Sequence, residues 1–168
     1  MMIISSTQPD WKREKIIPGK YDPGKHLLLT IRSYQRLKAN NDFLSKMISP
    51  FLVLRHRFWS AVSGADIPLN SKIGGGLMIP HPNGIVIHPD AEIGPNCLIF
   101  QQVTIGKGFK PGLPVIDGHV DIGAGAKIIG NIHIGAHARI GANAVVLNDV
   151  PEASTAVGIP AIVHNKQQ

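Results

Sequence analysis

Residues 122–146 read IGAGAKIIGNIHIGAHARIGANAVV, and they contain a six-residue repeat that indicates the fold. Each six-residue unit opens with isoleucine, often continues with glycine, and carries a small or β-branched residue at its fifth position. The same step runs back along the chain, and isoleucine occupies 67, 73, 79, 85, 87, 93, 99, 105, 116, 122, 128, 134 and 140. Only a two-residue slip at 85–87 and an eleven-residue gap at 105–116 interrupt it. A fixed short period of this kind is the signature of a solenoid.

A period of six has a simple geometric explanation. Each unit supplies one short extended segment and one bend, so three units make an 18-residue lap of a triangular prism. Isoleucine then points inward on every face, glycine permits the bend, and the small fifth residue fills a tight corner. Successive laps pair as parallel strands at about 4.8 Å. We therefore predict a mainly β protein, a parallel β-helix over residues 66–168 with a loop insertion at 107–115 and a C-terminal tail.

The composition agrees with such a core and excludes several protein classes. Aromatic residues make up only 5% of the 168 residues, while 23 are isoleucine, as expected of an interior without room for rings. No run of 18 apolar residues exists, so we expect no transmembrane helix. No signal peptide is evident, and the single cysteine, Cys97, allows neither an intrachain disulfide nor a cysteine-cluster zinc site. We expect a cytoplasmic protein.

The positive charge is confined to the first third of the chain. The whole chain carries a net charge of +6, but residues 1–65 hold 11 Lys+Arg against 4 Asp+Glu, and the remainder is nearly neutral. The basic residues form no block and are not interleaved with aromatics, which argues against nucleic-acid binding. A solvated helical face is the preferred interpretation.

Residues 1–65 predict an arm followed by a helical cap. Proline and glycine in residues 1–25 indicate an extended arm. Apolar residues recur at helical spacing from His26, Asp42 is placed to cap a second helix, and Ser49-Pro50 predicts a break before a third helix over 51–62. Ser63-Gly64 ends the cap.

Five stretches of the sequence carry a family resemblance: HRFWSAVSGADIP (56–68), KIGGGLMIPHPNGIVIHPDAEIG (72–94), QQVTIG (101–106), residues 122–146 and VGIPA (157–161). They resemble the hexapeptide-repeat acyltransferases, whose coil is a left-handed parallel β-helix, and among these serine O-acetyltransferase. The resemblance implies an acetyl-CoA-dependent O-acetyltransferase that requires no metal and forms homotrimers with active sites between subunits.

Two residues carry the catalysis that the resemblance implies. His81 aligns with the family's general base, which removes the acceptor hydroxyl's proton as the oxygen attacks the thioester. Asp66 aligns with the carboxylate that orients this imidazole. Their separation of fifteen residues is close to one lap. An exposed turn histidine and an ordinary turn aspartate are the alternatives.

The resemblance also implies a coenzyme A site along the groove between columns. It places backbone contacts at Ala124 and Ala142, with Gly106 at the start of the inserted loop. We expect Lys107, Lys110 and Arg139 to contact the nucleotide phosphates of coenzyme A. Arg139 matches a basic position of the family, whereas the two lysines are chosen only for their location in the inserted loop. The loop 107–115 is interpreted as a lid over the acyl donor.

The chain departs from the family where the amino-acid acceptor is bound. Gly112 and Leu113 stand in place of an Arg-His pair, and Pro80 in place of an acidic residue before the catalytic histidine. These changes remove charges that a free amino acid needs. We therefore favour a sugar hydroxyl in polysaccharide biosynthesis as the acceptor, with L-serine as the alternative.

Two other classes stay open, a non-catalytic β-helical scaffold and a metal-dependent lyase. His119 and His137 are 18 residues apart and should stack on successive laps, but they lack a third ligand, so no metal site is assigned. Cys97 occupies a corner position and is interpreted as packing.

Overall fold

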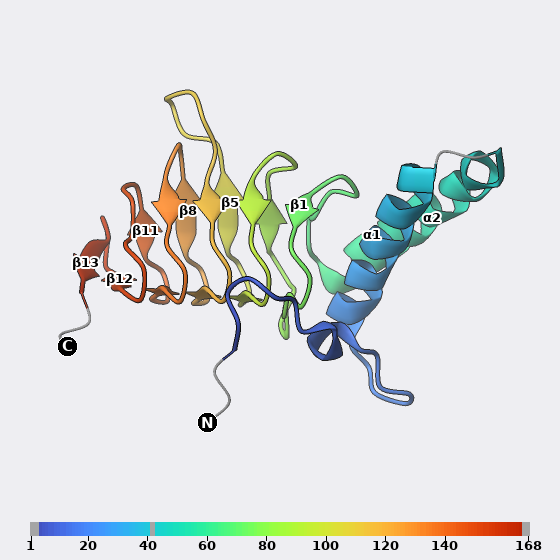
Figure 1. Ribbon diagram of the computed structural model, residues 1–168, viewed down its shortest axis with the longest axis horizontal. Helices are drawn as coiled ribbons and strands as arrows, with labels where there is room; N and C mark the ends of the chain where they lie inside the picture. Colours follow the sequence, from blue (N-terminus) through green and yellow to red (C-terminus); the bar gives the residue numbers. More distant parts are fainter. Residues whose placement is uncertain (1–3, 41–42, 166–168) are drawn as a thin grey trace.

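The computed structural model describes residues 4–40 and 43–165, and it consists of two helices leading into a three-sided coil of short strands (Figure 1). A 3-10 helix, η1, spans Trp11–Glu14, and the two long helices are α1 (Pro23–Asn40) and α2 (Phe43–Ser63). The strands are β1 (Lys72–Ile73), β2 (Val86–Ile87), β3 (Glu92–Ile93), β4 (Leu98–Ile99), β5 (Thr104–Gly106), β6 (Val115–Ile116), β7 (Asp121–Ile122), β8 (Lys127–Ile129), β9 (His133–Ile134), β10 (Arg139–Ile140), β11 (Val145–Val146), β12 (Thr155–Val157) and β13 (Ile162–His164).

The chain visits three sheets in turn. Their strand orders are β1-β3-β6-β9, β13-β12-β10-β7-β4 and β11-β8-β5-β2. All pairings are parallel except that of β12 with β13, which folds the end of the chain back on the last lap. The prediction of a parallel coil with three strands per lap is therefore confirmed.

The register of the sheets shows where laps are lengthened. Ile116 pairs with Ile134 and Ile122 with Ile140, an 18-residue step. Ile73 pairs with Ile93, twenty residues on, and Ile93 pairs with Ile116, twenty-three residues on. The extra residues lie in the turn between Ile79 and Val86 and in the loop after β5, so the coil accommodates them without losing its pairing. Figure 1 shows the loop projecting beyond neighbouring turns.

The core consists of the residues that the repeat places inside. The isoleucines of the middle laps are at most 3% exposed. The fifth-position residues are wholly buried, and they include Ala91, Cys97, Val103, Val120, Ala126, Ala138 and Ala144. Large side chains would not fit at these corners, which explains why aromatic residues are few.

The N-terminal third differs from prediction at the proline. We expected a break at Ser49-Pro50, but α2 runs through Pro50 without interruption. A proline removes one backbone hydrogen bond from a helix, and packing can outweigh this loss; α2 is packed along α1 and the first lap. In addition α1 begins at Pro23 rather than His26, and the expected cap at Asp42 lies outside the described residues. No helix in the described part of the chain is long and apolar enough to cross a membrane.

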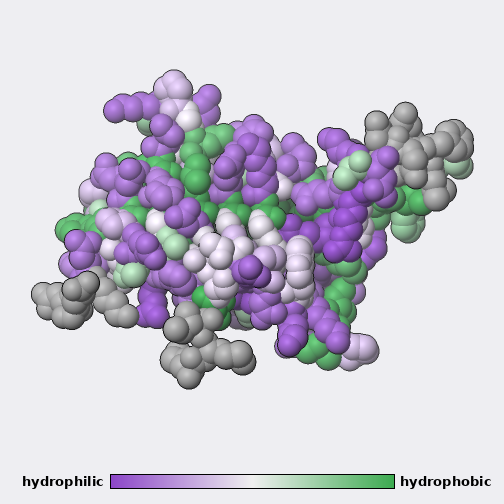
Figure 2. Space-filling model, in the orientation of Figure 1, coloured by the Kyte–Doolittle hydropathy of each residue, from purple (hydrophilic) through white to green (hydrophobic). Residues whose placement is uncertain are grey.

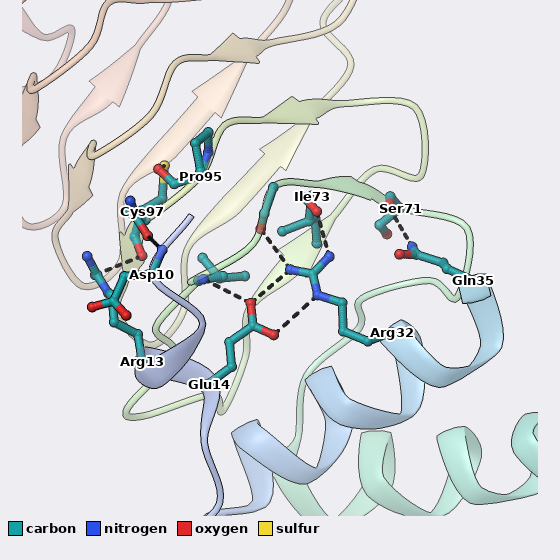
Figure 3. A network of polar contacts seen from close by, with 12 residues as sticks. Asp10, Arg13, Glu14, Arg32, Gln35, Ser71, Ile73, Pro95 and Cys97 are labelled. Atoms are coloured by element: carbon teal, nitrogen blue, oxygen red, sulfur yellow. Dashed lines mark hydrogen bonds and ion pairs between the residues drawn. The ribbon is translucent and has the colours of Figure 1, made fainter. Parts of the chain in front are cut away.

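The arm is anchored to the prism by a network of polar contacts (Figure 3). The Arg32 guanidinium donates to both carboxylate oxygens of Glu14, at 2.9 and 3.2 Å, and to the carbonyls of Ile73 and Gly74. Asn96, fully buried, accepts from the Asp10 amide at 2.7 Å and donates to the carbonyls of Ser5 and Gln8. The arm therefore covers one edge of the first laps.

Candidate active site

His81 lies exposed in the lengthened turn that leads into β2. Buried Ile79 and Ile85 flank the turn and anchor it in the core. The turn also contacts the end of α2, because the Gly84 amide donates a hydrogen bond to the Gly64 carbonyl at 2.7 Å. Gly64 has φ +67° and ends the helix, as predicted. The two extra residues of this lap thus give His81 an accessible position on an otherwise tight edge.

Phe100 lies next to His81 on the following lap. The two ring centroids are 6.5 Å apart with an interplanar angle of 26°. No motif in the sequence points to Phe100, although its place in the repeat is a signal. On this edge the residue after the isoleucine is Gly123 or Gly141 on the later laps, whereas it is Pro80 or Phe100 on these two neighbouring laps.

Asp66 occupies the first lap, beside β2. Its amide donates to the Ile85 carbonyl at 2.8 Å, and its carbonyl accepts from the Ile87 amide at 3.0 Å. The backbone of Asp66 is therefore held against the strand that follows the His81 turn, and its side chain is exposed. No hydrogen bond or ion pair joins the Asp66 carboxylate to His81 among the described residues, so their pairing stays a prediction.

Ala124 and Ala142 lie on the same edge of the prism as His81, on later laps. The Asn143 amide donates to the Ala124 carbonyl at 2.8 Å, which stacks the two turns directly. A Cβ at Gly123 would come within 2.6 Å of the Ala142 nitrogen, so only glycine fits there. On the laps that follow His81 and Phe100, this edge therefore carries two stacked turns that begin with small residues, Gly123-Ala124 and Gly141-Ala142.

Gly106 and Lys107 lie on the next edge. Gly106 ends β5, and its carbonyl accepts from the Gly130 amide at 3.0 Å. Lys107 and Lys110 line a groove of about 840 Å³ under the loop, together with Phe109, Ile129, Leu147 and Asp149. Of the predicted coenzyme A residues, Ala124 and Ala142 lie on one edge and Gly106 and Lys107 on the next, and these two edges flank the sheet β11-β8-β5-β2.

Arg139 lies apart from both groups. It is exposed on β10, in the sheet β13-β12-β10-β7-β4, with Asp121 and Thr155 as its strand neighbours. The structure therefore brings together His81, Ala124 and Ala142 but does not bring Arg139 beside Lys107 within one chain.

His119 and His137 stack on the third edge, as their 18-residue spacing predicts. Their Nδ1 atoms are 2.7 Å apart. Burial lowers the pKa of His119 below its ordinary 6.5, and the positive charges of His137, Arg13 and Arg139 lower it further, against the opposing effect of Asp121. Among the described residues no three His, Cys, Asp or Glu side chains are grouped so as to hold a metal.

Cys97 has the environment of a packing residue. It is fully buried, and burial raises the pKa of its thiol to about 11. A thiol with such a pKa is protonated at neutral pH and is therefore a poor nucleophile.

Comparison with known proteins gives the family. No family model matches the chain. It is 41% identical over 145 residues to the serine acetyltransferase of Helicobacter pylori strain J99, covering 83% of this chain and 80% of that protein. The chain belongs to the serine acetyltransferase family. This confirms the resemblance seen in the sequence.

Other members of the serine acetyltransferase family are longer than this chain. The serine acetyltransferase of Synechococcus elongatus is 46% identical over 105 residues, which are 61% of this chain and 43% of that protein. A solved serine acetyltransferase in complex with CoA superposes with a TM-score of 0.72 at 38% identity, covering 86% of this chain and 58% of that one. The chain thus spans about half the length of these two relatives.

Proposed function

We propose that this chain is an acetyl-CoA-dependent O-acetyltransferase in which residues 66–168, wound as a left-handed β-helix, carry the reaction and residues 1–65 form the arm and cap. The observation that carries the proposal is the position of His81. It is an exposed imidazole in a lengthened turn, on the same edge as the small-residue column of Ala124 and Ala142. The serine acetyltransferase relatives and the CoA-bound structure support the choice of acyl donor.

In the proposed reaction His81 acts as general base. Its neutral imidazole accepts the proton of the acceptor hydroxyl while the oxygen attacks the thioester carbonyl carbon. The carbon–sulfur bond then breaks, the acetyl group stays on the acceptor oxygen, and the imidazolium returns the proton to the CoA thiolate. Asp66 is proposed to stabilise the imidazolium. A histidine suits both steps because its ordinary pKa is near neutrality.

The column of small residues is proposed to receive the extended arm of coenzyme A. Side chains at Gly123, Ala124 and Ala142 are short enough to let a ligand approach the backbone amides. Lys107 and Lys110 supply positive charge at the neighbouring edge, where Gly106 starts the loop, and Arg139 supplies it on the adjoining face. Because these groups lie on different parts of one prism, we propose a homotrimer in which a neighbouring subunit completes the site.

L-Serine is the acceptor that the comparisons support better. The curated relatives at 41–48% identity are named serine acetyltransferases. A sugar hydroxyl is the second candidate, because Pro80, Gly112 and Leu113 carry no charge to receive an ammonium or carboxylate group. The polysaccharide interpretation stays a prediction that rests on these three positions alone.

Thiol release from acetyl-CoA tests the proposal. The full chain is assayed with L-serine, with a panel of sugars and with no acceptor. Turnover that depends on L-serine supports the main proposal, and turnover with a sugar alone supports the second candidate. No release with any acceptor, together with no binding of acetyl-CoA, would leave a scaffold as the better account. A stoichiometric metal in the purified chain, without thiol release, would favour a lyase.

A further inference from the structure

The first lap of the coil has a neighbouring lap on one side only. β1 is the terminal strand of its sheet, and the bridge between Asp66 and Val86 adds one residue pair beyond β2, the terminal strand of another sheet. The outer side of this lap is therefore a sheet edge, whose peptide groups point away from the coil. Figure 1 shows that α1 and α2 lie at this end of the coil. Partners for the buried carbonyls of this edge must come from the helices.

Two side chains of α1 bind the later part of the first lap. Arg32 donates to two of its carbonyls, and the Gln35 Nε2 atom donates to the carbonyls of Leu69 and Ser71 at 3.2 and 2.9 Å (Figure 3). The helix that covers this edge is accordingly polar, and Figure 2 shows that the visible face of α1 is largely hydrophilic. The outward carbonyls are thus bound by side chains in place of a further lap.

His56 of α2 binds the earlier part of the same lap. Its Nε2 atom lies 2.8 Å from the carbonyl oxygen of Ile67. A carbonyl oxygen only accepts, so Nε2 carries a proton and donates it in this contact. Ile67 is 0% exposed, so water does not reach its carbonyl and a protein donor is needed. Ile67 directly follows Asp66, the carboxylate proposed to stabilise the His81 imidazolium.

The segment that carries Asp66 is thereby held from two sides. Toward the coil, the Asp66 amide and carbonyl are bonded to Ile85 and Ile87, at 2.8 and 3.0 Å. Both bonds lie on the same side of the strand, so they resist sliding of the strand more than tilting. The bond from His56 acts on the opposite side, one residue along. It therefore opposes the tilt that would move the exposed Asp66 side chain.

We propose that His56 is a positioning residue for Asp66. Its bond to the Ile67 carbonyl fixes the direction of the Asp66 carboxylate relative to the His81 turn, and so sets how well the imidazolium is stabilised. The inference rests on the proposed function, in which Asp66 and His81 act together. Groups of a catalytic site must be held within about 0.5 Å of their working positions. His56 acts through Asp66 and takes no part in the proton transfer.

Steady-state kinetics of the full chain test the proposal with two polar variants that differ in length. The side chain of His56→Asn is too short to reach the Ile67 carbonyl, whereas His56→Gln places an amide N–H near the position of Nε2. We expect His56→Asn to lower kcat about tenfold through misalignment, with little change in the KM for acetyl-CoA, and His56→Gln to recover most of the loss. Gln35→Leu, which removes a donor from the same lap away from Asp66, is the matched control and should keep the wild-type kcat.

The pH profile of kcat/KM separates positioning from a general loss of structure. A nearby carboxylate favours the charged form of an imidazole, so losing its alignment should move the acidic limb of the profile to lower pH. Asp66→Asn should move this limb in the same direction, and Asp66→Asn/His56→Asn should lose no more activity than Asp66→Asn alone. A variant that is only less stable keeps the wild-type profile. If His56→Asn does not fold, His56→Phe, which keeps a ring but has no donor, takes its place.

The possible outcomes distinguish this inference from the proposed function. Wild-type kcat and an unmoved acidic limb in His56→Asn would overturn the inference, and so would equal losses in His56→Gln and His56→Asn. Loss of activity in Asp66→Asn without loss in His56→Asn would overturn this inference alone. An Asp66→Asn variant with the wild-type kcat and profile would overturn the proposed role of Asp66, and the role of His56 with it.

Discussion

The rings of His81 and Phe100 lie 6.5 Å apart at an interplanar angle of 26°, on neighbouring laps of the same prism edge. Phe100 is half-buried and His81 is exposed, so the Phe100 ring limits the positions open to the imidazole on one side. A general base must be held within about 0.5 Å of its working position to be effective. We infer that Phe100 positions His81.

Replacing Phe100 should therefore impair turnover more than substrate binding. Phe100→Ala is expected to lower kcat about tenfold, because a displaced base loses alignment with the hydroxyl, while the KM for acetyl-CoA changes little. Phe100→Leu should lose less, and Tyr21→Ala, which removes an exposed ring from the arm, serves as the control. The His81 imidazole proton resonances should also move in Phe100→Ala. Unchanged kcat and unchanged resonances would show that the ring contact has no positioning role.

Removing Glu14 should destabilise the fold. Its carboxylate and the Arg32 guanidinium are each 9% exposed, and Glu14 also accepts from the Leu77 amide at 3.1 Å. Glu14→Ala leaves a buried cation unpaired, which typically costs about 3–5 kcal/mol. Urea denaturation followed by circular dichroism measures the effect. Glu92→Ala breaks the exposed pair with Lys72 and should cost less than about 1 kcal/mol; equal losses in the two variants would refute the distinction.

The histidine pair should make stability depend on pH. Because the pKa of His119 is lowered in the fold, the unfolded chain binds this proton more tightly than the folded chain does. The contribution of His119 to the free energy of unfolding is complete above pH 6.5, the ordinary pKa of histidine. It is lost as the pH falls below 6.5 and through the lowered pKa of the folded state. His119→Asn keeps a residue suited to the φ of +56° there.

Thermal unfolding between pH 7.5 and 5 checks this effect. The unfolding midpoint of His119→Asn should fall less over this range than that of the wild type. His164→Asn, an exposed control, should follow the wild type. If His119→Asn lost stability with acid as steeply as the wild type, the pair would not be the source of the dependence.

The hexapeptide repeat predicted most of the prism, because each repeat forms the same short strand followed by the same bend. Ile93, Ile99 and Ile105 are buried because the first residue of each repeat points into the core. His119 contacts His137 because the lap between them is 18 residues long. The arm could not be foreseen in the same way. Asn96 binds Ser5 across 91 residues, and no periodic signal links them.

The helices and the site show the limits of local signals. Pro50 predicts a helix break when neighbours in space are unknown, yet packing along α1 outweighs one lost hydrogen bond. His81 could be found from its motif, but its approach to Phe100 depends on the 20-residue register of the first lengthened lap. That Arg139 and Lys107 lie on separate faces also appears only in three dimensions.

The assignment of His81 as general base is the central claim, and one variant tests it directly. Thiol release from acetyl-CoA is measured for wild type and His81→Ala with the acceptor that the wild type uses, after both are shown to unfold at the same temperature. Loss of a general base typically costs 10²–10⁴-fold, so we predict that kcat falls by about this factor while acetyl-CoA binding remains. Full activity in His81→Ala would contradict the proposed mechanism.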